Sequence, residues 1–381
     1  MRVALVHDYL NQFAGAERVL GVLARMFPAA PIYTLVYDDE LTGRAFRGRT
    51  IRTSFLQRWP FARRHHRLFL LAMPMAIETF SFAEYDLVIS DSASFAKGII
   101  TKPTTLHLNY CHTPTRYLWL DTHKHVAEFP APRLARRLMP LALNYLRLWD
   151  REASARVDYF IANSRCVAER IGKFYNRSAA VIYPPVATER FGLGGTPKNF
   201  YLMVGRMLPY KRFDVAIEAF NELGYPLKII GDGPEMARLR RLAKRNVEFV
   251  GKVSDERLGW FYRHAVALIF PGEEDFGLAP VEAMACGRPV AAFRRGGALE
   301  TVVEGVTGIF FEEQSAAAII TAVRRLERSH FDPHAIRAHA RSFDESVFEE
   351  RMRRFIERAW QEWRGVRVPI EIASRPTFAR V

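Results

Sequence analysis

Residues 271–290 read PGEEDFGLAPVEAMACGRPV, and an apolar run at 265–270 comes directly before them. We expect the apolar run to form a buried strand and a helix to begin near Leu278, with a polar, glycine-containing loop between them. The exposed N–H groups and the positive end of the helix dipole favour an anion such as phosphate at this loop. Glu274 in the loop and Glu282 on the helix can accept hydrogen bonds from the hydroxyls of one extended ligand. A helix with acidic residues near its start would explain Glu274 but not the whole segment.

The segment belongs to a repeated alternation of strands and helices in the second half of the chain. Apolar runs typical of strands are separated there by amphipathic stretches typical of helices. Strands are expected at 200–204, 227–230, 247–250, 265–270, 289–293 and 308–311, and helices at 213–223, 235–244 and 255–262. This β-α-β alternation predicts a doubly wound α/β domain, which we place at residues 198–344.

The first half of the chain shows a similar alternation. Its apolar runs predict buried parallel strands at 3–6, 86–89, 106–110 and 159–162, with a helix beginning at Gly15. These elements define a first α/β domain at residues 1–185. Pro- and Gly-rich stretches at 183–186 and 192–197 separate it from the second domain. A long amphipathic helix at 345–365 is expected to pack back on the first domain.

A basic segment follows the strand expected at 200–204. It reads GRMLPYKR over residues 205–212, so Arg206 and Lys211 lie near the carboxyl end of a strand, where ligands of open α/β sheets bind. Two cations there can clamp a diphosphate, Arg through its planar guanidinium and Lys as a point charge. Taken alone, such a segment is more often a basic surface turn.

Together these segments resemble the retaining glycosyltransferases of family 4, which have the two-domain GT-B fold. The family pattern is a glutamate, seven further residues, a second glutamate and, later, a Gly-Gly pair. Glu274, Glu282 and Gly296-Gly297 match it here. The resemblance implies that Glu274 contacts hydroxyls of the donor sugar and that Glu282 binds the ribose of the nucleotide. It also implies an α/β fold with two Rossmann-like domains that face each other across a cleft.

The resemblance extends to the basic segment and to the start of the helix. It implies that Arg206 and Lys211 neutralise the leaving phosphate as the glycosidic bond breaks, which is electrostatic stabilisation of developing charge. Two cations in this role remove the need for a divalent metal, so we expect no metal and no cofactor. The residues expected to bind the donor around the helix start are Phe276, Gly277 and Leu278.

Two segments of the first domain are further candidates. The loop before the first helix resembles the family's Gly-Gly-Ala-Glu-Arg, with Ala14 in place of the first glycine and Gly15 and Ala16 near the donor. An ordinary helix start would use the glycine in the same way. His112 ends an expected strand, and the family has a His-x-Pro at this point near the donor sugar. A single histidine is more often structural than catalytic, and both interpretations stay open.

A weaker signal follows the strand expected at 247–250. The backbone of family members often meets the nucleotide base at this point. Lys252 and Val253 are therefore included among the donor-binding residues.

The formal net charge of +14 favours polyanionic partners: nucleic acid, anionic lipid or phosphorylated small molecules. Basic and bulky apolar residues interleave at 58–69 and 133–139. Such interleaving suits an interfacial helix on an anionic membrane surface. A solvated basic face is an equally good interpretation. No nucleic-acid-binding module is recognisable, so we expect no nucleic acid as a partner.

Sequence features also bear on location and redox chemistry. The run at 3–6 is too short for a signal peptide, and the longest apolar stretch, 68–77, is too short to span a bilayer and is broken by Pro74. The chain has three cysteines, Cys111, Cys166 and Cys286. Because they are odd in number and far apart, we expect neither disulfides nor a zinc site. We expect a cytoplasmic protein, peripheral on the inner face of the plasma membrane if the basic segments bind it.

These features predict a retaining glycosyltransferase that moves a sugar from a nucleoside diphosphate to an acceptor hydroxyl. The EEDFG and YCHTPTRY segments look most like bacterial mannosyltransferases that use GDP-mannose in polysaccharide assembly. UDP- and dTDP-sugars remain open as donors. The basic segments would suit a polyprenyl-diphosphate-linked acceptor. Sugar-nucleotide 2-epimerases share the two-domain fold and are the alternative, and a basic nucleic-acid-binding protein is a remote one.

Overall fold

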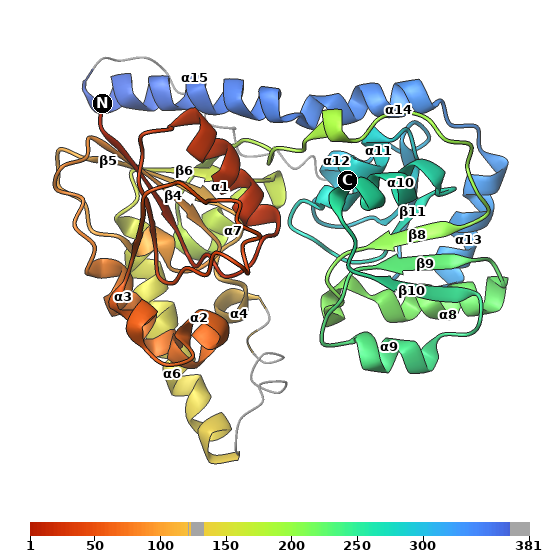
Figure 1. Cartoon of the computed structure of the whole chain (residues 1–381), viewed down its shortest axis with the longest axis horizontal. Coiled ribbons are helices and arrows are strands. Elements are labelled where there is room, and N and C mark those ends of the chain that lie inside the picture. Colours follow the sequence, from red (N-terminus) through yellow and green to blue (C-terminus); the bar gives the residue numbers. More distant parts are fainter. Residues whose placement is uncertain (121, 123–132, 366–381) are drawn as a thin grey trace, which may run out of the picture. The chain divides into compact units, whose positions relative to one another are not determined.

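The computed structural model describes residues 1–120, 122 and 133–365. The chain divides into two compact units: Met1–Tyr183 together with the chain from Glu349 onward, and Pro184–Phe348. Each unit has its own sheet, and the strand pairings within both sheets are parallel. Each sheet is flanked by helices (Figure 1). This is the architecture of doubly wound α/β domains.

The residues that connect the two sheets group with the second unit. The backbone N–H of Val186 donates to the carbonyl oxygen of Phe343 at 3.0 Å, so the connection is hydrogen-bonded to the end of that unit. The second unit therefore begins earlier in the chain than residue 198. The chain returns to the first unit within α15 (Glu345–Trp363), from Glu349 onward.

The sheet of the second unit has six strands in the order β10-β9-β8-β11-β12-β13. They are β8 (Tyr201–Val204), β9 (Leu227–Ile230), β10 (Val247–Gly251), β11 (Leu268–Phe270), β12 (Val290–Phe293) and β13 (Gly308–Phe311). The helical segments are η4 (Thr188–Arg190), η5 (Pro209–Lys211), α8 (Phe213–Leu223), α9 (Met236–Leu242), α10 (Asp255–His264), α11 (Leu278–Ala285), α12 (Ala298–Thr301), α13 (Ala316–Arg328), α14 (Pro333–Ala340) and η6 (Arg341–Phe343). The expected strands and helices are confirmed, but β11 begins later than residue 265 because Ala265 still caps α10.

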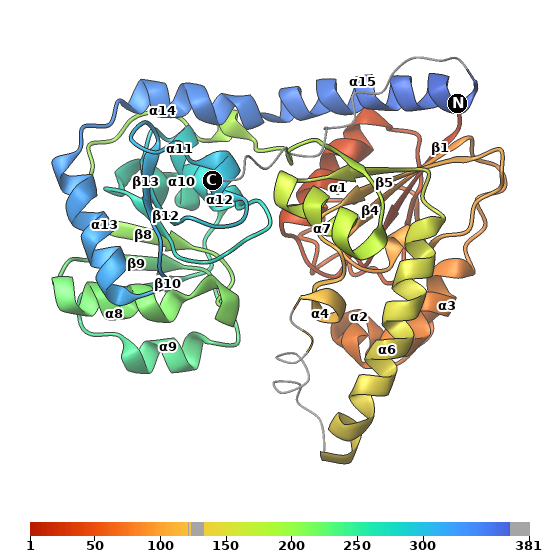
Figure 2. The same cartoon turned by 180° about the vertical axis from the view of Figure 1, so that it is seen from behind.

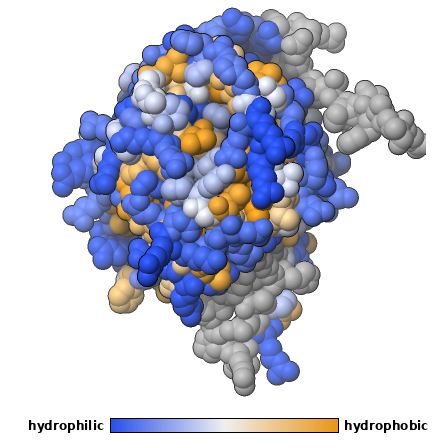
Figure 3. Space-filling view, turned by 90° about the vertical axis from the view of Figure 1, so that its right-hand side faces the viewer, coloured by the Kyte–Doolittle hydropathy of each residue, from blue (hydrophilic) through white to orange (hydrophobic). Residues whose placement is uncertain are grey.

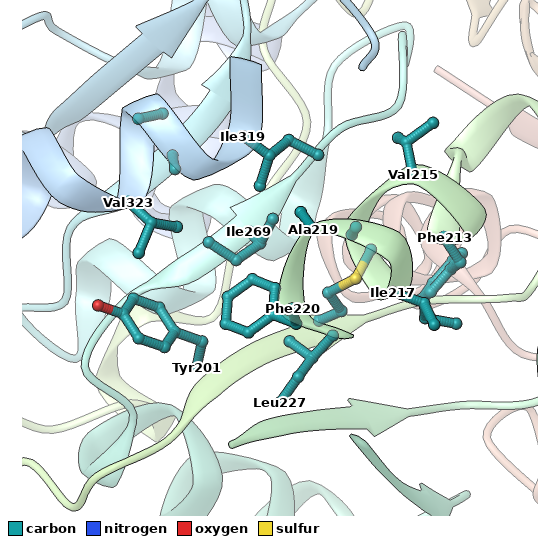
Figure 4. Packing of buried hydrophobic residues seen from close by; sticks show 14 of the residues in the cluster. Tyr201, Phe213, Val215, Ile217, Ala219, Phe220, Leu227, Ile269, Ile319 and Val323 are labelled. Carbon is teal, nitrogen blue, oxygen red and sulfur yellow. The ribbon is translucent and has the colours of Figure 1, made fainter. Parts of the chain in front are cut away.

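Helices cover both faces of this second sheet. Figure 1 shows α8 and α9 on one side of it and α10 and α11 on the other. On the side of α8, Phe220 packs with Ile269 of β11 and with Ile319 and Val323 of α13 (Figure 4). Hydrophobic residues on the outer face of this unit lie in small groups among hydrophilic ones (Figure 3). The strands are therefore packed into a buried core, and the loops at their carboxyl ends are left to carry chemistry.

The sheet of the first unit has seven strands in the order β3-β2-β1-β4-β5-β6-β7. They are β1 (Val3–His7), β2 (Ile32–Thr34), β3 (Ile51–Thr53), β4 (Leu87–Ser92), β5 (Leu106–Cys111), β6 (Tyr159–Ala162) and β7 (Ala179–Val181). The helical segments are α1 (Gly15–Met26), η1 (Phe55–Arg58), α2 (Ala62–His65), η2 (His66–Ala72), α3 (Met73–Glu78), η3 (Ala96–Gly98), α4 (Arg116–Trp119), α6 (Arg133–Ala155) and α7 (Arg165–Tyr175). The longest of them, α6, packs against α4 (Figure 2). Four strands and the helix start at Gly15 were expected, and β2, β3 and β7 were not.

The prediction of an interfacial helix over residues 58–69 is wrong. The chain there forms short pieces, because Phe61 takes a left-handed conformation (φ 63°) before α2 and Phe69 is non-helical inside η2. The residues at 133–139 do lie in a helix, α6, but the side chains of residues 133–136 and 138 lie outside the described residues. No helix in the described part of the chain is long and apolar enough to span a bilayer.

A buried ion pair joins several elements of the first unit. Lys97 Nζ lies 2.6 Å from Asp150 Oδ1, and the two side chains are 2% and 1% exposed. Asp150 also accepts hydrogen bonds from Thr115 Oγ1 (2.7 Å), Trp119 Nε1 (2.8 Å) and Tyr175 Oη (2.7 Å). This one carboxylate therefore ties η3, α4, α6 and α7 together.

Candidate functional site

The order of strands marks where a ligand is expected in the second unit. From β8 the chain continues to β9 and β10 on one side of the sheet order, and from β11 it continues to β12 and β13 on the other. The strands β8 and β11 are neighbours, paired at Leu202 and Leu268. Open α/β sheets bind ligands at the carboxyl ends of strands at such a switch point. The two segments singled out in the sequence, 205–212 and 271–278, leave these two strands.

At this point the structure brings together two of the expected catalytic residues. Lys211 Nζ donates a hydrogen bond to Glu274 Oε1 at 2.6 Å, and the two side chains are 15% and 18% exposed. Lys211 ends the short helix η5, and Arg212 turns the chain into α8 in a left-handed conformation (φ 50°). Arg206 is exposed near the start of the same loop. The arrangement places positive charge and a carboxylate at the edge where a phosphate-bearing ligand would bind.

Glycines let the surrounding loops approach each other closely. A Cβ on Gly272 would lie 2.8 Å from the Cα of Lys211, and a Cβ on Gly297 would lie 2.3 Å from the Cα of Phe276. The N–H of Gly297 donates to the carbonyl oxygen of Glu274 at 2.8 Å. The Gly-Gly pair recognised in the sequence therefore holds the loop that carries Glu274.

Replacing Gly297 with alanine should destabilise the second unit by about 1–3 kcal/mol, because the new Cβ would overlap the backbone of Phe276 and displace the loop. Urea unfolding measures the effect. Gly192→Ala is the matched control, since a Cβ at Gly192 meets nothing within 4 Å. Equal stability of the two variants would contradict the close approach.

The second glutamate has a more enclosed position than the first. Glu282 lies within α11, is 4% exposed, and accepts a hydrogen bond from Tyr262 Oη at 2.7 Å. The helix begins after Gly277, which is left-handed (φ 86°) and could not carry a side chain without strain. Phe276 and Gly277 are buried, and Leu278 is half-buried. The contact with Tyr262 fixes the Glu282 carboxylate, whose role toward a ribose stays a prediction.

The loops after β9 and β10 complete the same edge. Lys252 Nζ pairs with Asp232 Oδ2 at 3.0 Å, and the lysine side chain is 76% exposed. Val253 is half-buried. A Cβ on Gly231 would lie 2.1 Å from the carbonyl oxygen of Gly205, so the loop after β9 packs directly on the basic segment. Lys252 is thus connected to the loop of Arg206 and Lys211 through Asp232, whose carbonyl oxygen accepts a hydrogen bond from the N–H of Met207 at 2.7 Å.

The first unit has a second polar cluster at its own switch point, between β1 and β4. His7, the last residue of β1, is paired in register with Asp91 of β4, and His7 Nδ1 lies 2.8 Å from Asp91 Oδ2. His112, directly after β5, has its Nε2 at 2.6 Å from Asp91 Oδ1. On the other side, His7 Nε2 lies 3.6 Å from Glu17 Oε1. The expected site residue His112 is therefore the end of a larger buried network.

The same network holds the loop before α1. Glu17 Oε2 accepts a hydrogen bond from the backbone N–H of Ala14 at 2.8 Å. Gly15 and Ala16 begin α1 directly after it and are half-buried. The replacement of the family's first glycine by Ala14 is therefore compatible with a well-defined loop.

Burial and charge act against each other at these groups. Burial alone would lower the pKa of His7, but the hydrogen bonds and charges of Asp91 and Glu17 outweigh it and raise the pKa to about 10. Burial would raise the pKa of Asp91, but His112 and His7 lower it. The pKa of Glu17 is likewise lowered, chiefly by His7 against the effect of burial. His7 is thus a cation between two carboxylates.

Stability should fall as the pH rises from 7 to 9. Folded His7 keeps a proton that unfolded His7 loses above about 6.5, so its stabilisation is complete below that pH and is lost toward pH 10. The lowered carboxylates stabilise the fold throughout this window. The loss due to His7 should be about 2 kcal/mol, measured as the free energy of unfolding in urea. The double variant His7→Gln/Asp91→Asn keeps the net charge of the cluster and should show a weaker dependence on pH; an unchanged slope would contradict the assignment.

Sequence reasoning missed His7, Asp91 and Glu17 as members of a site. A usable signal was present, because His7 and Asp91 both lie at the ends of apolar runs expected to be parallel strands. The strand expected at 86–89 stopped short of Asp91, whereas β4 continues to Ser92.

Comparisons with known proteins agree with this architecture. Residues 13–190 match the family model described as "Glycosyltransferase Family 4", and residues 186–343 match the model "Glycosyl transferases group 1". The two matches together cover both units. The chain belongs to the family 4 glycosyltransferases. The sequence resemblance at family level is thereby confirmed.

Individual relatives match over part of their length. The chain is 31% identical over 174 residues to the uncharacterized glycosyltransferase MJ1178 of Methanocaldococcus jannaschii, covering 44% of this chain and 49% of that protein. It is 31% identical over 222 residues to a GDP-mannose-dependent alpha-(1-6)-phosphatidylinositol monomannoside mannosyltransferase of Mycolicibacterium smegmatis, covering 49% and 56%. A D-inositol 3-phosphate glycosyltransferase of Catenulispora acidiphila is 32% identical over 204 residues, covering 44% and 48%. The family 4 chain thus spans about half the length of these curated relatives.

Solved structures match over nearly the whole chain. The Anabaena protein Alr3699/HepE, crystallised in complex with UDP, gives a TM-score of 0.68 at 18% identity, covering 94% of this chain and 100% of that one. Sucrose-phosphate synthase of Thermosynechococcus elongatus gives 0.69 at 16% identity, covering 95% and 100%. At this identity the likeness establishes the fold, which is GT-B, as expected from the sequence.

Proposed function

We propose that this family 4 chain is a retaining glycosyltransferase, which moves a sugar from a nucleoside diphosphate to an acceptor hydroxyl. The observation that carries the proposal is the Lys211–Glu274 pair at the switch point of the second sheet. A cation suits the diphosphate, and a carboxylate beside it suits the hydroxyls of the adjoining sugar. Both lie on loops fixed by glycines rather than on a flexible surface.

The chemistry follows from these charges. Lys211 carries three N–H donors, so its ammonium can bind Glu274 and a phosphate oxygen together. Arg206, exposed on the same loop, is the second cation of the clamp. As the bond between the sugar and the diphosphate breaks, negative charge grows on the phosphate, and the two cations stabilise it. We infer that the phosphate then accepts the proton of the acceptor hydroxyl on the same face of the sugar.

The other site residues are given supporting roles in this proposal. Glu282 binds the ribose, Lys252 and Val253 lie near the base, and His112 binds a hydroxyl of the donor sugar. Glu274 fixes the sugar through its hydroxyls. No metal is proposed, because Arg206 and Lys211 supply the positive charge that a metal ion would otherwise provide.

For the donor we propose GDP-mannose. The EEDFG and YCHTPTRY segments, and the name of the Mycolicibacterium relative, favour it. Other donors must be tested beside it, because the Anabaena protein was crystallised with UDP and other relatives are named as inositol phosphate glycosyltransferases. A thermal-shift screen with GDP-mannose, UDP-glucose, UDP-galactose and dTDP-glucose decides it, because a matched donor raises the Tm by mass action. A larger shift with UDP- or dTDP-sugars would overturn the mannose assignment, and no shift with any would oppose the proposed function.

Transfer itself needs a second assay. With the donor that binds, release of free nucleoside diphosphate should require an added acceptor glycan and should yield a product of retained anomeric configuration. Isomerisation of the donor without acceptor would instead identify a sugar-nucleotide 2-epimerase.

We propose an anionic membrane surface as a partner and a polyprenyl-diphosphate-linked glycan as acceptor, in cell-surface polysaccharide synthesis. Residues 41–77 contain eight arginines and no Asp or Glu. Within this segment, exposed apolar side chains accompany the arginines: Phe61 (75% exposed), Leu68 (69%), Leu71 (55%) and Met75 (58%). Anionic headgroups attract such a surface, and the apolar side chains insert among them. The segment also contacts the loop after β1, where Asn11 Nδ2 donates to the carbonyl oxygen of Arg63 at 2.7 Å.

Vesicle co-sedimentation tests the membrane proposal. The chain should bind vesicles containing phosphatidylglycerol at low salt and bind pure phosphatidylcholine vesicles far more weakly. Phe61→Ser/Leu68→Ser should reduce binding by about tenfold or more, as expected for two buried apolar side chains. The control Leu299→Ser, at a side chain 53% exposed in the second unit, should not. Equal binding by both variants would refute the surface.

A further inference from the structure

Four side chains of the first unit form one line of polar contacts. It runs from Glu17 to His7, from His7 to Asp91 and from Asp91 to His112, with separations of 3.6, 2.8 and 2.6 Å. The first three side chains are 1%, 4% and 0% exposed, and His112 is 13% exposed. Only the last member of the line is accessible to a ligand.

The line determines which nitrogen of His112 carries a proton. A carboxylate only accepts hydrogen bonds, so His112 must donate from Nε2 to Asp91 Oδ1. In the neutral ring the proton on Nε2 leaves Nδ1 with a lone pair. Among the described residues, no hydrogen bond to His112 Nδ1 is present. That nitrogen can therefore accept a hydrogen bond from a hydroxyl.

His7 in turn orients the carboxylate. Both of its ring nitrogens face carboxylates, Asp91 at Nδ1 and Glu17 at Nε2, so the ring carries a proton on each: Nδ1 donates to Asp91, and Nε2 forms an ion pair with Glu17 at 3.6 Å. Asp91 consequently has one oxygen bound to His7 and the other directed to His112. Three buried ionised side chains are expensive to desolvate, and apolar residues would pack the same space at lower cost. Their arrangement is better explained by what it does to His112 than by packing.

The other end of the line holds the loop before α1. Glu17 accepts hydrogen bonds from the backbone N–H of Ala14 (2.8 Å) and from Gln12 Nε2 (3.1 Å). One set of contacts therefore fixes both the loop that leads to Gly15 and the ring of His112.

We propose that His7 and Asp91 are positioning residues, which hold His112 as the Nε2–H tautomer so that Nδ1 accepts a hydrogen bond from a substrate hydroxyl, and that Glu17 anchors the loop before Gly15 to the same network. The inference rests on the proposed function, because it requires a hydroxyl-bearing substrate at His112. It adds three buried residues to the first-domain part of the site, which the sequence placed at His112, Gly15 and Ala16.

Asp91→Asn tests the proposal with a change of one atom. The charge of Glu17 still favours a His7 ring protonated on both nitrogens, and in that state the amide oxygen of Asn must face His7 and the amide NH₂ must face His112. His112 then has to accept at Nε2, and its proton moves to Nδ1. We expect kcat to fall by about 100-fold with a smaller change in KM, as for other residues that orient a histidine through its second nitrogen.

The control is Asp86→Asn, at the residue just before the other end of the same strand. Asp86 Oδ2 accepts a hydrogen bond from the backbone N–H of Arg2, far along β4 from His112. This variant should keep wild-type kcat and KM. Equal kinetics for Asp91→Asn and the wild type would overturn the proposal.

A spectroscopic measurement separates this inference from the proposed function, because it needs no substrate. In long-range ¹H–¹⁵N spectra at pH 8.5, with His112 assigned through His112→Gln, wild-type His112 should be protonated on Nε2 alone. In Asp91→Asn it should be protonated on Nδ1. A wild-type ring protonated on Nδ1 would overturn the inference even where transfer is observed. The expected tautomers without detectable transfer would leave the positioning intact and refute the glycosyltransferase assignment. The wild-type spectrum decides the question even if Asp91→Asn does not fold.

Discussion

Replacing Lys211 with alanine should lower kcat for sugar transfer by about 1,000-fold or more while the chain stays folded, because two effects act together. The variant loses the cation that stabilises the leaving phosphate. It also leaves the Glu274 carboxylate, 2.6 Å from the Lys211 ammonium in the structure, without that positive charge beside it. A bound diphosphate would then meet an uncompensated negative charge. The loss should therefore exceed that of a simple hydrogen bond.

The measurement is steady-state transfer, with circular dichroism to show that the variant folds. Lys244→Ala is the control, since Lys244 is an exposed lysine of the same unit, and it should keep wild-type kcat. Affinity for the free nucleoside diphosphate separates the two effects. Lys211→Ala/Glu274→Gln should bind it more tightly than Lys211→Ala, because the repulsive charge is gone. Wild-type turnover by Lys211→Ala would refute the clamp.

The donor-side loops could be predicted from the sequence because the relevant residues are close together in the chain. Glu274, the helix start at Leu278 and Glu282 lie within one strand–loop–helix unit, and Lys211 follows another strand directly. What could not be predicted is the direct pairing of Lys211 with Glu274, which are 63 residues apart. That contact depends on β8 and β11 being neighbours, and the order of strands is a property of the whole sheet.

The network in the first unit was harder to predict for the same reason. His7 and Asp91 are 84 residues apart, and only the register of β1 against β4 brings them together. In a sequence, a charged residue at the end of an apolar run is normally assigned to a solvated loop. The short strands β2, β3 and β7 were missed because three residues give no measurable alternation.

The two switch points have different electrostatic characters. In the second unit, a cation and a carboxylate are each partly exposed and can change partners when a ligand binds. In the first unit, the charged side chains are buried and fixed to one another, and only His112 is partly exposed. Partly exposed charges suit the binding and release of a diphosphate. Buried charges suit the fixed orientation of one ring.

Replacing Asp150 with alanine should destabilise the first unit by about 3–5 kcal/mol, because it leaves the Lys97 ammonium buried without a partner. Thr115, Trp119 and Tyr175 lose their acceptor at the same time. Urea unfolding followed by tryptophan fluorescence measures the effect.

Asp255→Ala is the control, because its pair with Arg190 is 58% and 65% exposed and should contribute less than about 1 kcal/mol. Lys97→Met/Asp150→Asn should recover part of the loss, since it removes the buried charge and retains one acceptor oxygen. Loss of stability no greater than in Asp255→Ala would show that water reaches the pair. Because Thr115 lies three residues after His112, the same variant should also lower transfer in the fraction that remains folded.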